Sequence, residues 1–149
     1  MQKLNLPGYN AQIKEEEGKS FIFDIIRKKY VVLTPEEWVR QNFIHYLIRE
    51  KRYSGALMAV EKRVMVNGQP QRFDLLIYSR NGQPHLIAEF KAPSQKISQN
   101  AFDQAVRYNM ALKVNFIIIS NGLQHFICQI DYSKNSYAFL KDIPLYHNR

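Results

Sequence analysis

The alternation of hydrophobic and polar residues begins to predict regular structure near Phe21. Residues 21–33 are rich in β-branched and aromatic types, and they predict one or two short strands with a basic turn over residues 27–29. The preceding residues, 1 to about 18, are polar enough to form a loose N-terminal arm. We therefore expect the organised part of the chain to start after this arm.

A helix is predicted directly after these strands. Thr34 can cap it, Pro35 suits the first helical position, and Glu37 stands three residues after the cap, as in a capping box. Hydrophobic residues then recur at helical spacing and predict a buried face. These residues are Val39, Phe43, Tyr46 and Leu47.

The rest of the chain predicts strands around a second helix. Three strands are expected over residues 57–66, 72–79 and 85–91, separated by two Asn-Gly pairs, which are the strongest short hairpin signal. Residues 98–112 predict an amphipathic helix, and the segments NFIIIS and HFICQI predict a further hairpin with a last strand at 137–140. The order α-β-β-β-α-β-β indicates an α/β sandwich in which a crossover helix returns the fourth strand to the sheet.

Composition narrows the class of protein. With 149 residues, the chain has the usual size of one domain, and its 46% hydrophobic and 23% charged residues are typical of a globular protein. It has neither an apolar run of membrane-spanning length nor a secretory signal, so we expect a cytoplasmic location. Cys128 is the only cysteine, which excludes an intramolecular disulfide and a cysteine-rich zinc site.

The charge adds a hint about the partner. Lys and Arg number 21 against 13 Asp and Glu, and the net charge of +8 would attract a polyanion. Nucleic acid is the leading candidate. Because basic small proteins are common, the charge alone favours nucleic acid only weakly.

Two acids and a lysine come together if residues 81 and 82 form a two-residue type I′ turn. Arg80 then faces Gln83, and counting back along both strands places Asp74 opposite Glu89. Lys91 shares the face of Glu89, because strand side chains alternate. The other face is uniformly apolar. It carries Phe73, Leu75, Ile77, Leu86, Ala88 and Phe90.

Like charges that face each other across a sheet repel, unless a cation lies between them. Mg²⁺ prefers oxygen ligands and is typically held by one or two carboxylates, so Asp74 and Glu89 would suffice as the protein's contribution. Lys91 would then orient the attacking water or stabilise the developing negative charge. The alternative is a hairpin whose acids pair with Lys91 and Arg72 as solvated charges.

Several segments resemble one known family. FDIIRKKYVVLTPEEWVRQNFIHYLI, RFDLLIY, LIAEFKAP, DQAVRYN and SNG are similar to the nuclease domain at the N-terminus of type I restriction enzyme R subunits, over about residues 21–129. The resemblance implies the restriction-endonuclease-like sandwich, a central mixed sheet with an α-β-β-β-α-β core flanked by helices. It also implies DNA as substrate and Mg²⁺ or Mn²⁺ as cofactor. The PD-(D/E)-x-K residues of that family fall on Asp74, Glu89 and Lys91.

The resemblance implies three further site residues. The family's Q-x-x-x-Y helix motif is matched by Gln104 and Tyr108, and Glu37 is the counterpart of a helix glutamate that assists the metal. Gln104 and Tyr108 share a helix face and could instead close the edge of the core. Glu37 could equally be the acid of the capping box, since one carboxylate can hardly serve both the helix start and the metal.

Glu61 is a secondary candidate for the metal site. If Asn67 and Gly68 form a two-residue turn, Glu61 faces Asp74 and adds a third carboxylate. Pro70 argues against this register, because it cannot donate to a ladder and suggests a longer loop.

The sequence departs from the family in two respects, the first of which is that its first catalytic motif reads Phe73-Asp74 and not Pro-Asp, which keeps the ligand. The second concerns ATP. The sequence has no Gly-rich phosphate loop ending in Gly-Lys-Ser/Thr, so we expect no ATPase motor within it. The chain would then work alone or with other restriction-system subunits, and cutting both strands of a duplex would call for a homodimer. Two other functions stay open: a non-catalytic nucleic-acid-binding or assembly module, and a nuclease for RNA or branched DNA.

Overall fold

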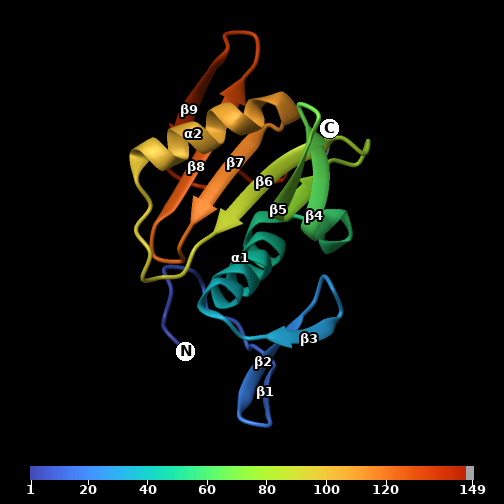
Figure 1. Ribbon diagram of the computed structural model, residues 1–149, viewed down its shortest axis with the longest axis vertical. Helices are drawn as coiled ribbons and strands as arrows, with labels where there is room; N and C mark the ends of the chain where they lie inside the picture. Colours follow the sequence, from blue (N-terminus) through green and yellow to red (C-terminus); the bar gives the residue numbers. More distant parts are fainter. Residues whose placement is uncertain (147–149) are drawn as a thin grey trace.

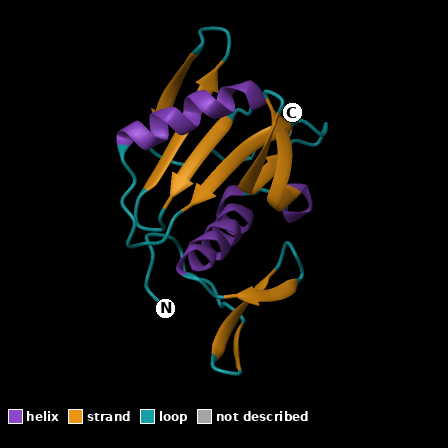
Figure 2. Ribbon diagram, in the orientation of Figure 1, coloured by secondary structure: helices purple, strands orange, loops and turns teal. Residues whose placement is uncertain are grey.

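A six-stranded mixed sheet forms the centre of the protein, and a smaller three-stranded sheet lies on the far side of the first helix from it (Figures 1 and 2). The computed structural model describes residues 1–146, apart from the side chain of Tyr108. The small sheet has the order β1-β2-β3 and the large sheet the order β4-β5-β6-β7-β8-β9. The strands of the small sheet are β1 (Ile13–Glu16), β2 (Lys19–Asp24) and β3 (Lys29–Val32). Those of the large sheet are β4 (Met58–Val66), β5 (Gln69–Tyr78), β6 (Pro84–Phe90), β7 (Phe116–Ser120), β8 (His125–Asp131) and β9 (Ser136–Leu140).

The first helix, α1 (Pro35–Lys51), forms where it is predicted. The Thr34 hydroxyl accepts a hydrogen bond from the Glu37 amide at 3.0 Å, and Pro35 begins the helix. The helix ends at Arg52, which has a left-handed φ of 64°. Of the four predicted core residues, Val39, Phe43 and Leu47 are fully buried and Tyr46 is half-buried.

The second helix, α2 (Gln99–Asn109), covers the other face of the large sheet. It connects β6 to β7, which pair in parallel, whereas the other neighbouring strands of this sheet are antiparallel. Alternate residues of β7 show the two layers, because Ile118 packs in the cluster of α1 while Ile117 and Ile119 pack in that of α2. The predicted mixed sheet with a crossover helix is therefore confirmed. Within residues 1–146, no helix has the length and apolarity needed to cross a membrane.

The turn between β4 and β5 has two residues. Asn67 and Gly68 have positive φ angles of 52° and 77°, as a type I′ turn requires, and Val66 pairs with Gln69. The objection from Pro70 was wrong. Pro70 pairs with Met65 in the part of β5 that extends past its pairing with β6, so its missing N–H is not needed by a third strand.

The turn between β5 and β6 is longer than expected. The Gly82 amide donates to the Ser79 carbonyl at 2.9 Å, and the Ser79 amide donates to the Gln83 carbonyl at 2.8 Å, so the predicted two-residue turn is wrong. Tyr78 consequently faces Pro84, and an irregularity between Ile77 and Tyr78 shifts the register back by one residue. Over Leu75–Ile77, the pairing is the one that counting along the strands predicted, and Asp74 and Glu89 lie just beyond this paired stretch.

Several of the first 18 residues contact the core. Leu4 is buried, the Asn5 amide donates to the Gly122 carbonyl at 2.8 Å, and the Tyr9 ring stacks on His45 with 3.7 Å between the ring centroids. Residues 13–16 form β1, which was not predicted. A few apolar anchors and backbone pairing suffice to order this segment, although most of its side chains are polar.

Candidate active site

Asp74 lies where β5 and β6 diverge. The two strands pair through Leu75 and Ala88, and Asp74 is the next residue of β5 beyond this pair. Its Oδ2 accepts a hydrogen bond from the Phe90 amide at 2.8 Å. The carboxylate of Asp74 therefore reaches the backbone of β6 directly beside Glu89.

Glu89 and Lys91 are set by the end of β6. Glu89 pairs with Ile119 of β7, and the Lys91 amide donates to the Ser120 carbonyl at 2.9 Å. Burial raises the pKa of the half-buried Glu89 carboxyl, the charge of Lys91 lowers it, and the charge of Asp74 raises it, with a net increase. The charges of Lys91 and Asp74 thus both lie within electrostatic range of Glu89.

Asp74 and Glu89 together resemble a donor set for a hard cation. In the described part of the chain, no group of three His, Cys, Asp or Glu side chains is arranged to hold a metal ion. Mg²⁺ needs only one or two carboxylates, because it keeps several waters and binds phosphate oxygens. The pKa of Glu89 is raised mainly by burial, and the charge of Asp74 adds to the increase. Mg²⁺ at these two carboxylates stays a prediction.

A cavity of about 360 Å³ opens beside Asp74. It lies between the large sheet, the start of α1 and the strand β3. Its lining includes Arg27, Glu37, Arg40, Glu61, Asp74 and Phe90. Charged side chains of both signs therefore surround this entrance to Asp74.

Glu37 is the centre of a buried ion-pair network in this wall. Its carboxylate accepts hydrogen bonds from Arg40 at 2.6 and 3.0 Å, from Arg27 at 2.7 Å and from Gln41 at 2.9 Å. Burial opposes ionisation, but these hydrogen bonds and the charge of Arg40 outweigh it and lower the pKa of Glu37. The carboxylate is directed at the arginines, and its role at a metal stays a prediction.

Sequence reasoning missed the arginines of this network. Arg40 also donates to the Asp74 carbonyl at 3.3 Å, so it links α1 to the strand that carries the acid. Arg27 pairs with Asp24, which is completely buried and also accepts from the Ile26 amide at 2.7 Å. The i,i+3 spacing of Glu37 and Arg40 was a signal for one pair, but nothing in the sequence indicated that Arg27 would join it.

Glu61 lines the same cavity as Asp74, although arginines hold its carboxylate. Its oxygens lie 3.1 Å from Arg72, 3.4 Å from Arg40 and 3.7 Å from Arg27. Glu61 has a left-handed φ of 56°, and its neighbours on both sides keep the predicted register with β5. Arg72, which the alternative interpretation paired with an acid of the β5–β6 hairpin, forms its ion pair with Glu61. Glu61 as a metal ligand stays a prediction.

Gln104, the first residue of the predicted helix motif, lies on the outer side of α2. Gln104 is exposed, on the side of α2 away from the buried Phe102 and Val106. The side chain of Tyr108 lies outside the described part of the structure. The roles of both residues stay predictions.

Comparison with known proteins identifies the family. A search of curated proteins found no match. A solved structure described as a fragment of an HsdR subunit of a type I restriction enzyme from Vibrio vulnificus YJ016 is similar, with 24% identity and a TM-score of 0.38. The similarity covers 58% of this chain and 18% of that chain. The family model described as "Type I restriction enzyme R protein N terminus (HSDR_N)" matches residues 35–144. The chain therefore belongs to the family of N-terminal regions of type I restriction enzyme R proteins.

Proposed function

We propose that this chain is the nuclease part of a type I restriction R protein and hydrolyses phosphodiester bonds in DNA with the help of a divalent metal ion. The observation that carries the proposal is the grouping of Asp74, Glu89 and Lys91 where β5 and β6 diverge, in a chain of this family. The mixed sheet with a helix on each face is consistent with the restriction-endonuclease-like sandwich, with residues 1–149 as a single PD-(D/E)-x-K domain.

Each of the three residues has a distinct role in this proposal. Asp74 and Glu89 hold Mg²⁺ or Mn²⁺ through their carboxylate oxygens. The bound ion supplies polarisation of the scissile phosphate and a lowered pKa for the attacking water. Lys91 places an ammonium beside the carboxylates, where it orients the water and stabilises the charge that develops on the phosphate. The hydrogen bond from the Phe90 amide fixes the orientation of Asp74.

The other predicted residues have lesser parts. Glu37 and Glu61 would have to release their arginines before they could bind the ion. We therefore propose that, in the free protein, both hold the arginines of the cavity wall in place. Gln104 and Tyr108 would contact DNA that lies over α2. The partners in this proposal are DNA and other restriction-system subunits, and a homodimer would cut both strands of a duplex.

The test combines metal binding with cleavage. Asp74→Asn keeps an oxygen that can accept from the Phe90 amide but removes the charge, so the fold should survive while the metal site does not. We expect Mn²⁺ binding, followed by electron paramagnetic resonance, in the parent protein but not in this variant. We also expect cleavage of plasmid DNA with Mg²⁺ or Mn²⁺, its loss with EDTA, and its loss in Asp74→Asn and Lys91→Ala.

Matched controls are exposed residues of the same types. Asp142→Asn and Lys134→Ala change the same charges outside the site and should leave binding and cleavage unchanged. Cleavage that persists in Asp74→Asn would overturn the mechanism. Duplex binding without metal binding or cleavage would favour a non-catalytic module, and preferential cleavage of RNA or branched DNA would reassign the substrate.

A further inference from the structure

The hairpin of β4 and β5 extends past the rest of the sheet as a two-stranded ribbon. β4 pairs with β5 from Met58 to Val66, whereas β6 pairs with β5 only over Leu75–Tyr78. The ribbon thus consists of residues 61–74. Between Glu61 and Asp74 at its base, it carries the basic residues Lys62, Arg63 and Arg72.

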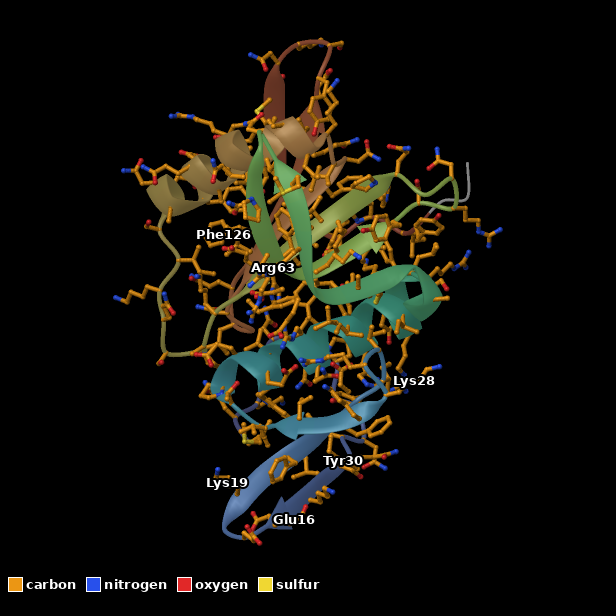
Figure 3. The ribbon with its side chains drawn as sticks, turned by 45° about the vertical axis from the view of Figure 1, so that its right-hand side comes forward. Glu16, Lys19, Lys28, Tyr30, Arg63 and Phe126 are labelled. Carbon is orange, nitrogen blue, oxygen red and sulfur yellow. The ribbon has the colours of Figure 1, made fainter. Side chains whose placement is uncertain are left out.

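Two arginines face each other across this ribbon. Arg63 and Arg72 are direct cross-strand partners, a like-charge arrangement that is unfavourable in the free protein. Arg63 is an exposed residue of β4 (Figure 3). Within residues 1–146, it takes part in no ion pair. The Arg72 side chain is 57% exposed and forms an ion pair with a carboxylate oxygen of Glu61 at 3.1 Å. An anionic ligand from solvent can therefore neutralise the charges of the two arginines.

The arginine pair adjoins the candidate active site. Glu61, which contacts Arg72, lines the same cavity as Asp74 and lies two residues before Arg63 in β4. Met65, the next residue on the face of Arg63, is 63% exposed, so no other part of the described chain covers this face. A ligand that reaches Asp74 through the cavity would pass Glu61, which contacts Arg72, the cross-strand partner of Arg63.

We infer that Arg63 and Arg72 form a phosphate clamp, which binds the backbone of duplex DNA next to the scissile phosphate. Planar guanidinium groups suit phosphate oxygens, and two of them side by side match the repeated negative charge of one strand. The inference rests on the proposed function in naming DNA as the ligand and the carboxylates as the cutting site. The repulsion between the arginines is relieved when the phosphates bind.

The experiment measures binding separately from cleavage. A short fluorescent duplex is titrated by anisotropy with the Asp74→Asn protein, so that cleavage cannot intervene. Each lost phosphate contact should weaken binding roughly tenfold at about 0.1 M salt and reduce the slope of log K against log salt by about 0.9. We expect this for Arg63→Ala, a reduction of about 1.8 for Arg63→Ala with Arg72→Ala, and a larger loss for Arg63→Glu.

Arg80→Ala is the matched control. Arg80 is an exposed arginine in the turn after β5, about 26 Å further along the strand direction than Arg72. It should bind DNA like its parent. Thermal unfolding adds a second readout, since removing one member of a repelling pair should leave the melting temperature of Arg63→Ala unchanged or raised.

The outcomes separate this inference from the proposed nuclease. Unchanged affinity and salt slope in Arg63→Ala and in the double variant would overturn the clamp, even if the parent protein cuts DNA. Equal losses in Arg80→Ala would also overturn it, because the effect would then reflect net charge alone. A selective loss in the Arg63 and Arg72 variants would support the clamp even if cleavage required further subunits. Binding of RNA but not duplex DNA would overturn the choice of ligand.

Discussion

Glu37→Ala should be among the most destabilising single changes in α1. The substitution removes the acceptor of four hydrogen bonds, three of them from the guanidinium groups of Arg27 and Arg40. Both arginines would stay in the cavity wall, where the side chain of Arg40 is only 9% exposed and that of Arg27 is 21% exposed. The free energy of unfolding should fall because positive charge is left buried without its partner.

The size of the effect follows from what each arginine retains. Breaking a buried ion pair by removing one partner typically costs about 3–5 kcal/mol. Arg27 would keep Asp24, and Arg40 would keep the more exposed Glu61 at 3.4 Å and the Asp74 carbonyl at 3.3 Å. These remaining partners place the expected loss near the lower end, at about 3 kcal/mol.

Urea unfolding followed by circular dichroism measures this loss, and Glu36→Ala is the control. Glu36 is the neighbouring acid in the first turn of α1 but is exposed, so its removal should cost only about 0.3–1 kcal/mol through the helix dipole. If Glu37→Ala unfolds at the same urea concentration as Glu36→Ala, the network contributes no more than a surface charge, and the reasoning fails.

The same network predicts a pH dependence. The pKa of Glu37 in the folded protein lies below its ordinary value of 4.5, so its ionised form stabilises the fold above pH 4.5. This stabilisation is lost as the pH falls through the lowered pKa. Glu37→Gln should therefore be less stable than the parent at neutral pH and should lose less stability between pH 4.5 and lower pH.

Two further changes test the acidic site and the N-terminal segment. The pKa of Glu89 is raised above 4.5 in the folded protein, so ionised Glu89 lowers stability as the pH rises through that pKa. Glu89→Gln should raise the melting temperature of the metal-free protein at neutral pH while abolishing Mn²⁺ binding, and a lower melting temperature would contradict this. Gly122 has a φ of +86°, and a Cβ there would lie 2.7 Å from a Leu4 methyl carbon. Gly122→Ala should thus lower the free energy of unfolding by roughly 1–3 kcal/mol in urea titrations, whereas Gly82→Ala, which meets no neighbour, should cost less.

The elements of the large sheet could be predicted because each has a local signal. The spacing of Val39, Phe43 and Leu47 indicated α1, and the alternation around the Asn-Gly pairs indicated the hairpins. The turn at Asn81 shows the limit of such signals. The turn type predicted there was wrong. Because the irregularity between Ile77 and Tyr78 shifts the register back by one residue, the pairing of Leu75, next to Asp74, still agrees with the prediction.

The side-chain network could not be predicted, since its members come from distant parts of the chain. Arg27 follows β2, Glu37 is in α1 and Glu61 is in β4, and only the folded arrangement brings them together. A lone acid at the start of a helix has several potential partners, among them the helix amides, a metal and an arginine. For Glu37, the sequence indicated the helix amides and a metal as partners. The arginine became its partner through the packing of the β2–β3 turn against α1.

The distribution of satisfied and unsatisfied charge supports a ligand site at the divergence of β5 and β6. The buried charges of Asp24, Glu37 and Arg40 are matched by partners within the protein, as burial requires. Two pairs of like charges lie elsewhere: the charge of Asp74 adds to the burial that raises the pKa of Glu89, and Arg63 faces Arg72 on the ribbon beside it. A cation would relieve the first repulsion and a polyanion the second. A metal ion together with a nucleic-acid backbone is the combination that relieves both at once, which ties the proposed cutting site and the proposed phosphate clamp to a single ligand complex.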